Sequence, residues 1–249
     1  MAKESELIRR IRDLSERSER SSSVTHSTFL TPAEQYEAEQ WIKPKNINAV
    51  FLGGTSDSER RIAVFYPEYM EKEEIKDADF LSAIKITAGF GTPGHRDYLG
   101  SILGLGIKRE WIGDILINDN IAYVICLPPS NLTILSELTH VSRYGVRCES
   151  VPVQEVPIPK KTVKQLSFTV QSRRFDAIIG CIFGISRTRA AKLISSGAAT
   201  LNYQECLKND AYVDDGDVIS ARGYGKAKLI GQTGQSRKGR IFLSAERYV

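Results

Sequence analysis

The sequence contains no long hydrophobic run. None of its apolar stretches approaches the roughly 18 residues that a membrane-spanning helix needs, so we expect no membrane segment and no membrane partner. Residues 1–20 alternate acidic and basic side chains without an apolar core, which argues against a secretory signal and an organelle transit peptide. These absences predict a cytoplasmic protein.

Residues that bind metals or act as nucleophiles are few and scattered. The four cysteines lie more than 20 positions apart without a Cys-x-x-Cys pair, and no histidine has a neighbour at metal-ligand spacing. The cysteines and histidines are Cys126, Cys148, Cys181, Cys206, His26, His95 and His140. We therefore expect no disulfide framework, no metal site and no cofactor.

Sequence signatures of common enzyme sites are also missing. No Ser-His-Asp or Cys-His arrangement indicates hydrolysis. Four glycines fall within and after a predicted helix, whereas a dinucleotide-binding loop places its glycines between a strand and a helix. They are Gly100, Gly104, Gly106 and Gly113. The sequence accordingly predicts no small-molecule substrate and no enzymatic activity.

The composition is that of a folded protein with both helices and sheets. Of the 249 residues, 41% are hydrophobic and 26% charged, enough for two modest domains. We predict an N-terminal helical segment at 1–45, a middle domain at 46–153, a proline-rich linker at 154–163 and a C-terminal domain at 164–249. The expected fold class is α+β.

The N-terminal segment is predicted to form two helices. Apolar residues recur at helical spacing between Leu7 and Leu14, among charged neighbours. Thr31 is a suitable cap for the second helix, Pro32 suits its first position, and Pro44 ends it. A polar segment, residues 21–27, would join the two helices.

The middle domain shows the element order β-α-β-β-α-β, which is typical of a ferredoxin-like fold. The expected elements are a strand at 84–88, a helix at 96–105, strands at 114–117 and 122–127, a helix at 130–141 and a strand at 146–151. A hairpin formed by residues 49–66 precedes them and would extend this sheet or flank it.

The net charge of +4 conceals two unlike parts. Residues 160–249 hold 16 Lys or Arg and 7 Asp or Glu, a net charge of +9. Residues 1–159 hold the other 18 basic and 23 acidic residues, a net charge of −5. Such a basic module suits a polyanion, although charge alone is also compatible with a solvated basic surface.

The basic module is predicted to begin with two helices. Phe175 starts an apolar face with spacing i, i+3, i+4 and i+7, Gly184 ends that helix, and Ser186 caps the next. Arg187 lies in the first turn of the second helix, where exposed amides favour phosphate. Arg189 and Lys192 share one face of it, three residues apart.

Further basic residues follow the helices. Arg222, Lys226 and Lys228 bracket a flexible Gly-Tyr-Gly segment, and a basic hairpin tip holds Arg237, Lys238 and Arg240. In the middle domain His95, Arg96, Lys108 and Arg109 flank the helix at 96–105 and are a possible second RNA surface. Arginines and lysines from several segments can follow the phosphates of a structured RNA.

The residues from 173 to 228 resemble the S4-type RNA-binding domain, also called the αL motif. The resemblance is carried by RFDAIIG, GISRTRAAKLISSG, LN and DGDVISARGYGK, in this order. It implies RNA contacts at Arg174, Ser186, Arg187, Arg189, Lys192, Asn202 and Arg222. Ala199, Thr200 and Tyr203 depart from the usual pattern, and Asp176 is expected to position Arg174 or cap a helix.

A wider resemblance covers nearly the whole chain. HRDYLGSILGLGIKREWIGDILIND at 95–119 and the C-terminal GQSRKGRIFLSAERY resemble the bacterial YlmH-like proteins, which include the cyanobacterial photosystem II S4 domain proteins. This implies a ribosome-associated protein that binds rRNA of the large ribosomal subunit, with tRNA as a further partner, during rescue or quality control of stalled ribosomes. An association with cell division also belongs to the family.

Two other functional classes stay open at this point. S4-type domains occur in pseudouridine synthases and RNA methyltransferases, but neither the R-L-D motif of the former nor the glycine-rich turn of the latter is present. A protein-interaction scaffold that works through the N-terminal helices is compatible with RNA binding.

Overall fold

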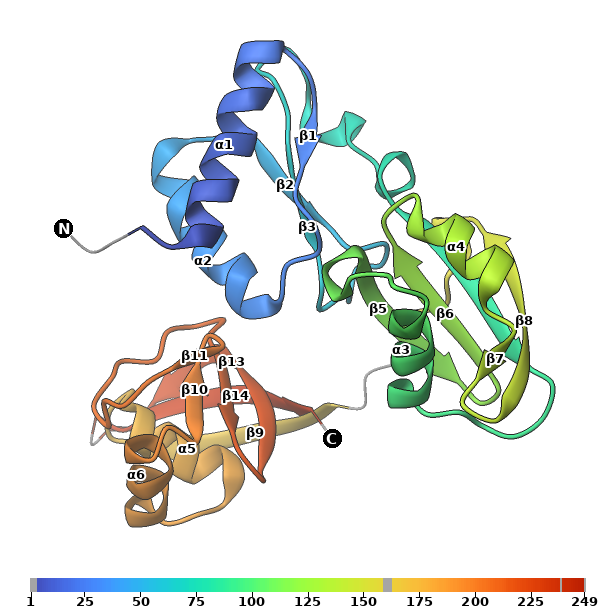
Figure 1. Cartoon of the computed structure of the whole chain (residues 1–249). Helices are drawn as coiled ribbons and strands as arrows, with labels where there is room; N and C mark the ends of the chain where they lie inside the picture. The colour runs from blue at the N-terminus through green and yellow to red at the C-terminus, as the bar shows by residue number, and fades with distance from the viewer. Residues whose placement is uncertain (1–3, 159–162, 238, 249) are drawn as a thin grey trace. The chain divides into compact units, whose positions relative to one another are not determined.

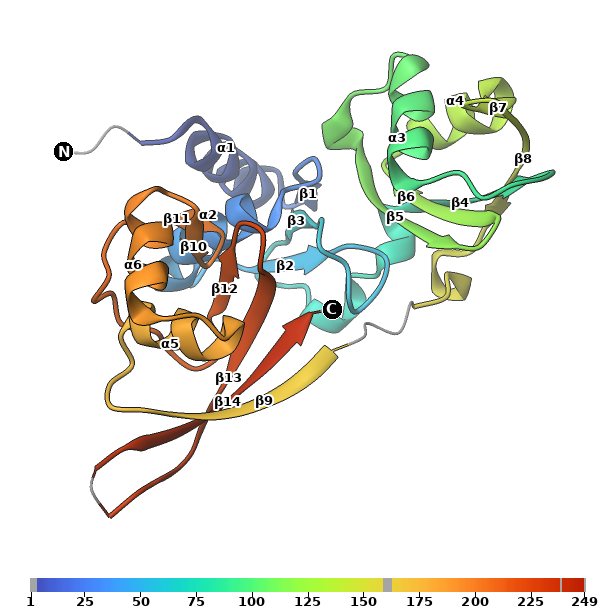
Figure 2. The same cartoon turned by 90° about the horizontal axis from the view of Figure 1, so that it is seen from below.

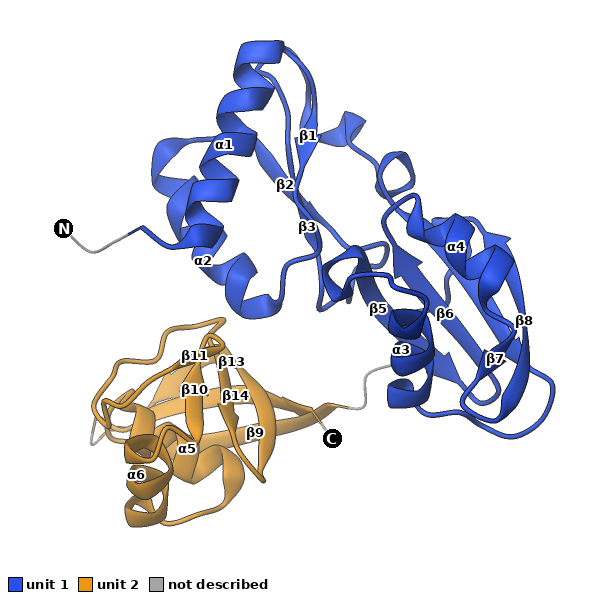
Figure 3. Cartoon of the chain, viewed as in Figure 1, with its two compact units in different colours: residues 1–159 blue, residues 160–249 orange. Residues whose placement is uncertain are grey.

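The computed structural model describes residues 4–158, 163–237 and 239–248. The chain forms two compact units, residues 1–159 and 160–249 (Figure 3). The described residues form six α-helices and three β-sheets, which confirms the prediction of a mixed protein with both kinds of element. Within these ranges no helix is long and apolar enough to cross a membrane.

Unit 1 begins with the two predicted helices, α1 (Glu6–Ser21) and α2 (Pro32–Ile42) (Figure 1). The hydroxyl of Thr31 accepts a hydrogen bond from the backbone N–H of Glu34, and the Glu34 carboxylate accepts one from the backbone N–H of Thr31. This reciprocal cap satisfies two amides that helix geometry leaves without partners. Ile11 of α1 is fully buried in the core below the two helices.

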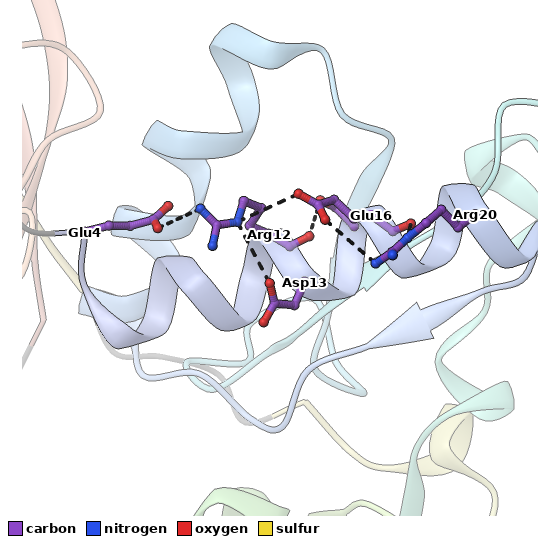
Figure 4. A network of polar contacts seen from close by, with 6 residues as sticks. Glu4, Arg12, Asp13, Glu16 and Arg20 are labelled. Atoms are coloured by element: carbon purple, nitrogen blue, oxygen red, sulfur yellow. Dashed lines mark hydrogen bonds and ion pairs between the residues drawn. The ribbon is translucent and has the colours of Figure 1, made fainter.

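Much of the charge on α1 is neutralised on the helix itself (Figure 4). Arg12 lies 2.8 Å from Glu4, 3.9 Å from Asp13 and 3.8 Å from Glu16. Arg20 lies 3.8 Å from the other oxygen of Glu16. Exposed pairs of this kind contribute roughly 0.3–0.5 kcal/mol each, so they support the helix weakly and keep its charge balanced.

The first sheet has the strand order β1-β3-β2, with β1 (Thr25–His26), β2 (Ala49–Leu52) and β3 (Ile62–Phe65). The predicted hairpin is β2 and β3, and it does not extend the middle sheet. Its third strand comes from the segment predicted as a polar connection, where Thr25 pairs with Phe65. Two residues are too few to show strand periodicity in the sequence, so β1 could not be predicted.

Strand β3 is buried on both faces, because each face has its own core. Ala63 and Phe65 pack with Ile11 of α1 and Ile42 of α2. Ile62, Val64 and neighbouring side chains form a second core with residues of the middle sheet, including Ile125 and Leu127. The two-residue period of a strand sends alternate side chains to opposite faces, so one short strand joins the helices to the middle sheet.

The second sheet has the strand order β5-β6-β4-β8-β7, and all its neighbouring strands are antiparallel. Its elements are β4 (Ser82–Ala88), α3 (His95–Gly104), β5 (Ile112–Asn118), β6 (Ile121–Cys126), α4 (Ser130–Glu137), β7 (His140–Val141) and β8 (Tyr144–Val151). The helix predicted at 130–141 ends at Glu137, because the residues near its predicted end form β7 instead.

Helices α3 and α4 cover one face of this sheet (Figure 1). Tyr98 and Ile102 of α3 and Ile134 of α4 are fully buried against strand residues such as Ile84 and Ile86. The opposite face belongs to the core shared with β3. The middle sheet is therefore buried on both sides, and its loops and strand ends provide the exposed surface.

Unit 2 consists of two helices and a six-stranded antiparallel sheet with the order β11-β10-β12-β13-β14-β9. Its elements are β9 (Val163–Val170), α5 (Phe175–Phe183), α6 (Arg187–Ser195), β10 (Ala199–Leu201), β11 (Gln204–Glu205), β12 (Val218–Ala221), β13 (Gly225–Gln235) and β14 (Ile241–Tyr248). Strands β13 and β14 form the long hairpin in Figure 2. Strand β9 was not predicted, although Leu166, Phe168 and Val170 alternate with polar residues.

The two predicted helices of unit 2 are confirmed. Each of the four residues of the expected α5 face, the first of which is Phe175, is at most 2% exposed. Gly184 ends α5 with φ of +66°, a left-handed conformation that glycine adopts without steric cost. The hydroxyl of Ser186 then caps α6 by accepting the N–H of Arg189.

Candidate nucleic-acid interface

The start of α5 places one carboxylate between two arginines. Arg174 donates from Nε to Asp176 Oδ1 at 3.2 Å and from Nη2 to Oδ2 at 3.1 Å. Arg187, at the start of α6, donates from Nη2 to the same Oδ2 at 2.8 Å. Asp176 therefore positions both guanidinium groups, which agrees with the sequence-based expectation for Arg174 and extends it to Arg187.

Burial differs across this cluster. The Asp176 side chain is 8% exposed, whereas those of Arg174 and Arg187 are 41% and 61% exposed. Burial by itself raises the pKa of the Asp176 carboxyl, but hydrogen bonds from Arg174 and Arg187 outweigh it and hold the pKa below its ordinary 3.8. The carboxylate stays charged at neutral pH, and the exposed edges of both arginines face solvent.

We expect Asp176→Asn to destabilise unit 2 by about 1 kcal/mol at neutral pH, because the charge-assisted hydrogen bonds are lost, and solvent around the two exposed arginines screens most of their strength. A carboxyl with a lowered pKa in the folded state contributes its stability fully above 3.8 and loses it as the pH falls through the folded-state pKa. Urea unfolding at about pH 7 and about pH 3 measures this. An equal difference between wild type and variant at both pH values would contradict the assignment.

A concave pocket of about 590 Å³ lies beside this cluster. Arg174, Arg187 and Arg240 all line it, the last from the start of β14. Arg240 reaches the pocket because Ile241 of β14 pairs with Val170 of β9. The fold thus brings together two arginines from the helix pair and one from the hairpin tip, which are more than 50 positions apart in the sequence.

The outer face of α6 carries Arg189 and Lys192, and both side chains are exposed. Within the described parts of the chain, neither forms an ion pair with a carboxylate. Ala190 and Ile194 on the other face are fully buried, which fixes the orientation of the helix. Since α6 is oriented by its core contacts, the positions of its basic residues are set by the fold.

The side chain of Asn202 forms its hydrogen bonds within a turn. Its backbone is left-handed with φ of +50°, its Nδ2 donates to Asp217 Oδ1 at 2.8 Å, and its Oδ1 accepts the N–H of Val218 at 3.0 Å. Arg222 and Lys228 are exposed on the β12–β13 hairpin. Asn202 therefore stabilises the turn that precedes this hairpin and its basic residues.

Lys226 has aromatic neighbours that the sequence did not indicate. Its Nζ lies 5.8 Å from the centre of the Tyr203 ring and 5.3 Å from that of Tyr248. Tyr248 comes close only because β14 pairs along β13, so no local pattern could have revealed it. A lysine between two tyrosines offers both a charge for phosphate and rings for base or sugar contact.

The predicted basic hairpin tip is a turn between β13 and β14. Ser236 N–H donates to Arg240 O at 2.8 Å, and Gly239 N–H donates to Ser236 O at 2.9 Å. Arg237 and Arg240 are exposed. Lys238, which was also predicted to contact RNA, lies outside the described residues.

The possible second surface in the middle domain is divided between the two ends of α3. His95 and Arg96 are exposed in its first turn, whereas Lys108 and Arg109 follow its end. A helix of this length separates the two pairs by roughly 15 Å. They cannot act as one compact cluster, so each end has to be considered by itself.

Lys108 and Arg109 line a pocket of about 410 Å³ with Arg10 and Arg60. Arg60 donates to the backbone oxygens of Phe29 and Ile112, and Arg109 also donates to the oxygen of Ile112. Burial and the neighbouring Arg60 lower the pKa of Arg109. Arg60 is therefore a clamp between distant segments of unit 1, whereas Arg109 bonds to the backbone just after it.

Among the described residues, no group of three or more His, Cys, Asp or Glu side chains could hold a metal ion. All four cysteines are free, and burial raises the pKa of the Cys126 thiol to about 12 and that of the Cys148 thiol to about 11. Thiols with such pKa values remain protonated and unreactive at neutral pH.

Comparison with known proteins finds similarity to one family. A family model described as the putative RNA-binding domain in YlmH matches residues 76–155. A curated relative is the "Ribosome-associated protein quality control protein P2" of Bacillus subtilis (strain 168), which is 28% identical over 222 residues. That match covers 88% of this chain and 85% of the relative. The predicted resemblance to the YlmH-like family is confirmed.

A solved structure supports the fold. The "Cell division protein ylmH from Streptococcus pneumoniae" matches with a TM-score of 0.53 and 21% sequence identity. The match covers 63% of this chain and 98% of that one. At this level of identity the match shows a shared fold over that part of this chain.

Proposed function

We propose that the protein is a non-enzymatic RNA-binding protein of the cytoplasm that associates with ribosomes. In this proposal it binds rRNA of the large subunit, with tRNA as a second ligand, during rescue or quality control of stalled ribosomes. The arrangement of Arg174, Arg187 and Arg240 around one pocket carries the proposal, because three exposed guanidinium groups converge there and no described residue that lines the pocket carries a carboxylate. Guanidinium groups of this kind are suited to phosphate.

The domain assignment belongs to the same proposal. We assign unit 2 to the S4-type RNA-binding domain and propose that the middle sheet is ferredoxin-like, with 1–45 as a helical segment, 46–153 as the middle domain and 154–163 as the linker. Residues 159–162 of this linker lie outside the described residues. The helix pair α5–α6 followed by antiparallel strands supports the first assignment. The order β5-β6-β4-β8 with the connections β4-α3-β5 and β6-α4-β8 supports the second.

The proposed RNA surface of unit 2 combines four regions. The cluster at Arg174 and Arg187 adjoins the hairpin tip, the outer face of α6 presents Arg189 and Lys192, and the start of β13 adds Lys226 with its tyrosines. Basic side chains on several elements match the phosphates of a folded RNA better than they match the phosphates of one extended strand. Ser186 and Asn202 support the surface through the α6 cap and the hairpin turn.

Sedimentation through a sucrose gradient tests this function. We expect the tagged full-length protein to migrate with large ribosomal subunits at low salt and to be partly released at high salt, because phosphate contacts depend on salt. A gradient of the protein without ribosomes is the control for aggregation. Migration with free tRNA alone, or with neither species, would contradict the proposal.

A further inference from the structure

An exposed aromatic pair lies at one end of the middle sheet, outside the surface proposed above. Phe90, in the loop between β4 and α3, is 65% exposed. Its ring centre is 5.3 Å from that of Tyr144, the first residue of β8, with an angle of 68° between the rings. The loop and the β7–β8 turn lie at the same end of the sheet (Figure 1). An exposed phenylalanine held edge to face by a tyrosine is a flat apolar surface open to solvent.

The loop that carries Phe90 is anchored to the sheet. Gly89 N–H donates to Gly145 O at 3.1 Å. Gly91 has φ of +71°, and a Cβ atom at this position would lie 2.4 Å from Cε1 of Tyr144. Only glycine allows the chain to turn this tightly against the tyrosine ring. Phe90 is therefore presented at the surface by its neighbours.

One basic side chain contacts the aromatic pair, and two more follow the loop in the first turn of α3. The guanidinium carbon of Arg143 lies 5.2 Å from the centre of the Tyr144 ring, and its Nη2 donates to the Tyr144 hydroxyl at 3.2 Å. No ion pair between Arg143 and a carboxylate occurs in the described ranges. His95 and Arg96 are exposed in the adjacent first turn of α3. The nearby Asp97 carboxylate accepts the N–H of Gly94 as a helix cap.

We propose that Phe90, Tyr144 and Arg143 form a platform for single-stranded RNA, on which an unpaired base stacks against Phe90. Arg143 and Arg96 would hold the flanking phosphates. Every base has a π face, so an ordered exposed ring with neighbouring cations binds unpaired nucleotides with little sequence preference. The excess of cations favours a polyanion over an apolar peptide. This inference rests on the proposed RNA-binding function and assigns the middle domain its own ligand, unpaired RNA.

Fluorescence anisotropy with an unstructured, fluorescein-labelled RNA dodecamer and the full-length protein tests the platform. We expect Phe90→Ala to weaken binding about tenfold, since stacking of one base has roughly this effect on affinity. Leu132→Ala is the matched control, because Leu132 is a 63% exposed apolar residue of α4 in the same unit. We expect that control to bind as the wild type does.

A second pair of variants tests the contribution of the positive charge of Arg143. Arg143→Ala should weaken binding severalfold and reduce its salt dependence. The charge control is Arg147→Ala, because Arg147 lies three residues after Tyr144 on β8, so that its side chain points to the face opposite that of Tyr144, where it pairs with Glu149 at 3.1 Å. Phe90→Trp should retain affinity within about threefold, and its added fluorescence should be quenched by RNA relative to the wild type, which contains Trp41 and Trp111.

The outcomes separate this inference from the proposed function. If Phe90→Ala binds the dodecamer as tightly as the wild type while both migrate with large subunits, the platform is wrong and the proposed function stands. If Phe90→Ala loses only its migration with ribosomes, the surface contacts a protein, and the platform is again wrong. If the wild type binds no RNA of any kind, both proposals fail.

Discussion

Replacing Arg187 and Arg189 together with alanine is expected to weaken binding to ribosomal RNA by about 100-fold at low salt. Each charge-assisted hydrogen bond contributes roughly 1.5 kcal/mol or more, and the variant removes two exposed guanidinium groups from the start of α6. The slope of log affinity against log salt should fall by about 0.7–0.9 for each phosphate that the variant no longer neutralises. Filter binding or anisotropy at several salt concentrations measures both quantities.

A charge-matched variant controls for the loss of two positive charges. Arg9 and Arg17 are exposed on α1, and neither forms an ion pair within the described ranges. Arg9→Ala with Arg17→Ala changes the net charge equally but leaves unit 2 intact. We expect this control to retain nearly wild-type affinity and slope. If the α6 variant keeps its affinity and slope, Arg187 and Arg189 do not contact RNA.

Phe175→Ala is expected to destabilise unit 2 by about 3–5 kcal/mol, the range for removing a fully buried phenylalanine. Phe175 is 0% exposed, belongs to the core of unit 2 and stands between Arg174 and Asp176 at the start of α5. The cavity would loosen the element that aligns the two arginines on Asp176. Loss of RNA binding should follow unfolding of unit 2 in urea, monitored by circular dichroism.

The matched control for this stability effect is Leu207→Ala. Leu207 is 57% exposed in unit 2, so its truncation leaves no cavity and should change the free energy of unfolding by less than about 0.5 kcal/mol. A Phe175→Ala protein as stable as this control would contradict the core assignment. A stable variant that nevertheless loses RNA would show that Phe175 acts through the position of Arg174.

The helices of both units were predictable because their signals are local. The Thr31 cap, the apolar spacing that begins at Phe175 and the Gly184 stop are all contained within about one to three helical turns of sequence. Strand β1 was missed because two polar-flanked residues carry no periodicity. Strand β9 carries an alternating pattern, but its partner β14 lies more than 70 positions later, and sequence separation hides that pairing.

The candidate interface was predictable in part. Charge counting located the basic unit, and the S4-type resemblance indicated the helix pair and Asp176 as a positioning residue. The sequence did not show that Arg240 shares a pocket with Arg174 and Arg187, or that Tyr248 lies beside Lys226. Both contacts depend on the register of β14, which is set by long-range pairing with β13 and β9.

By itself, the sequence determined the division of charge between a −5 segment and a +9 segment, the existence and caps of most helices and the YlmH-like resemblance. Composition, capping and periodicity act over a few residues and can be evaluated along the chain. Only the tertiary structure decided which cations meet, that Arg60 is a clamp between distant segments, and that Phe90 is exposed beside Tyr144. These features arise from contacts between distant segments, where burial and strand register determine which side chains reach the surface.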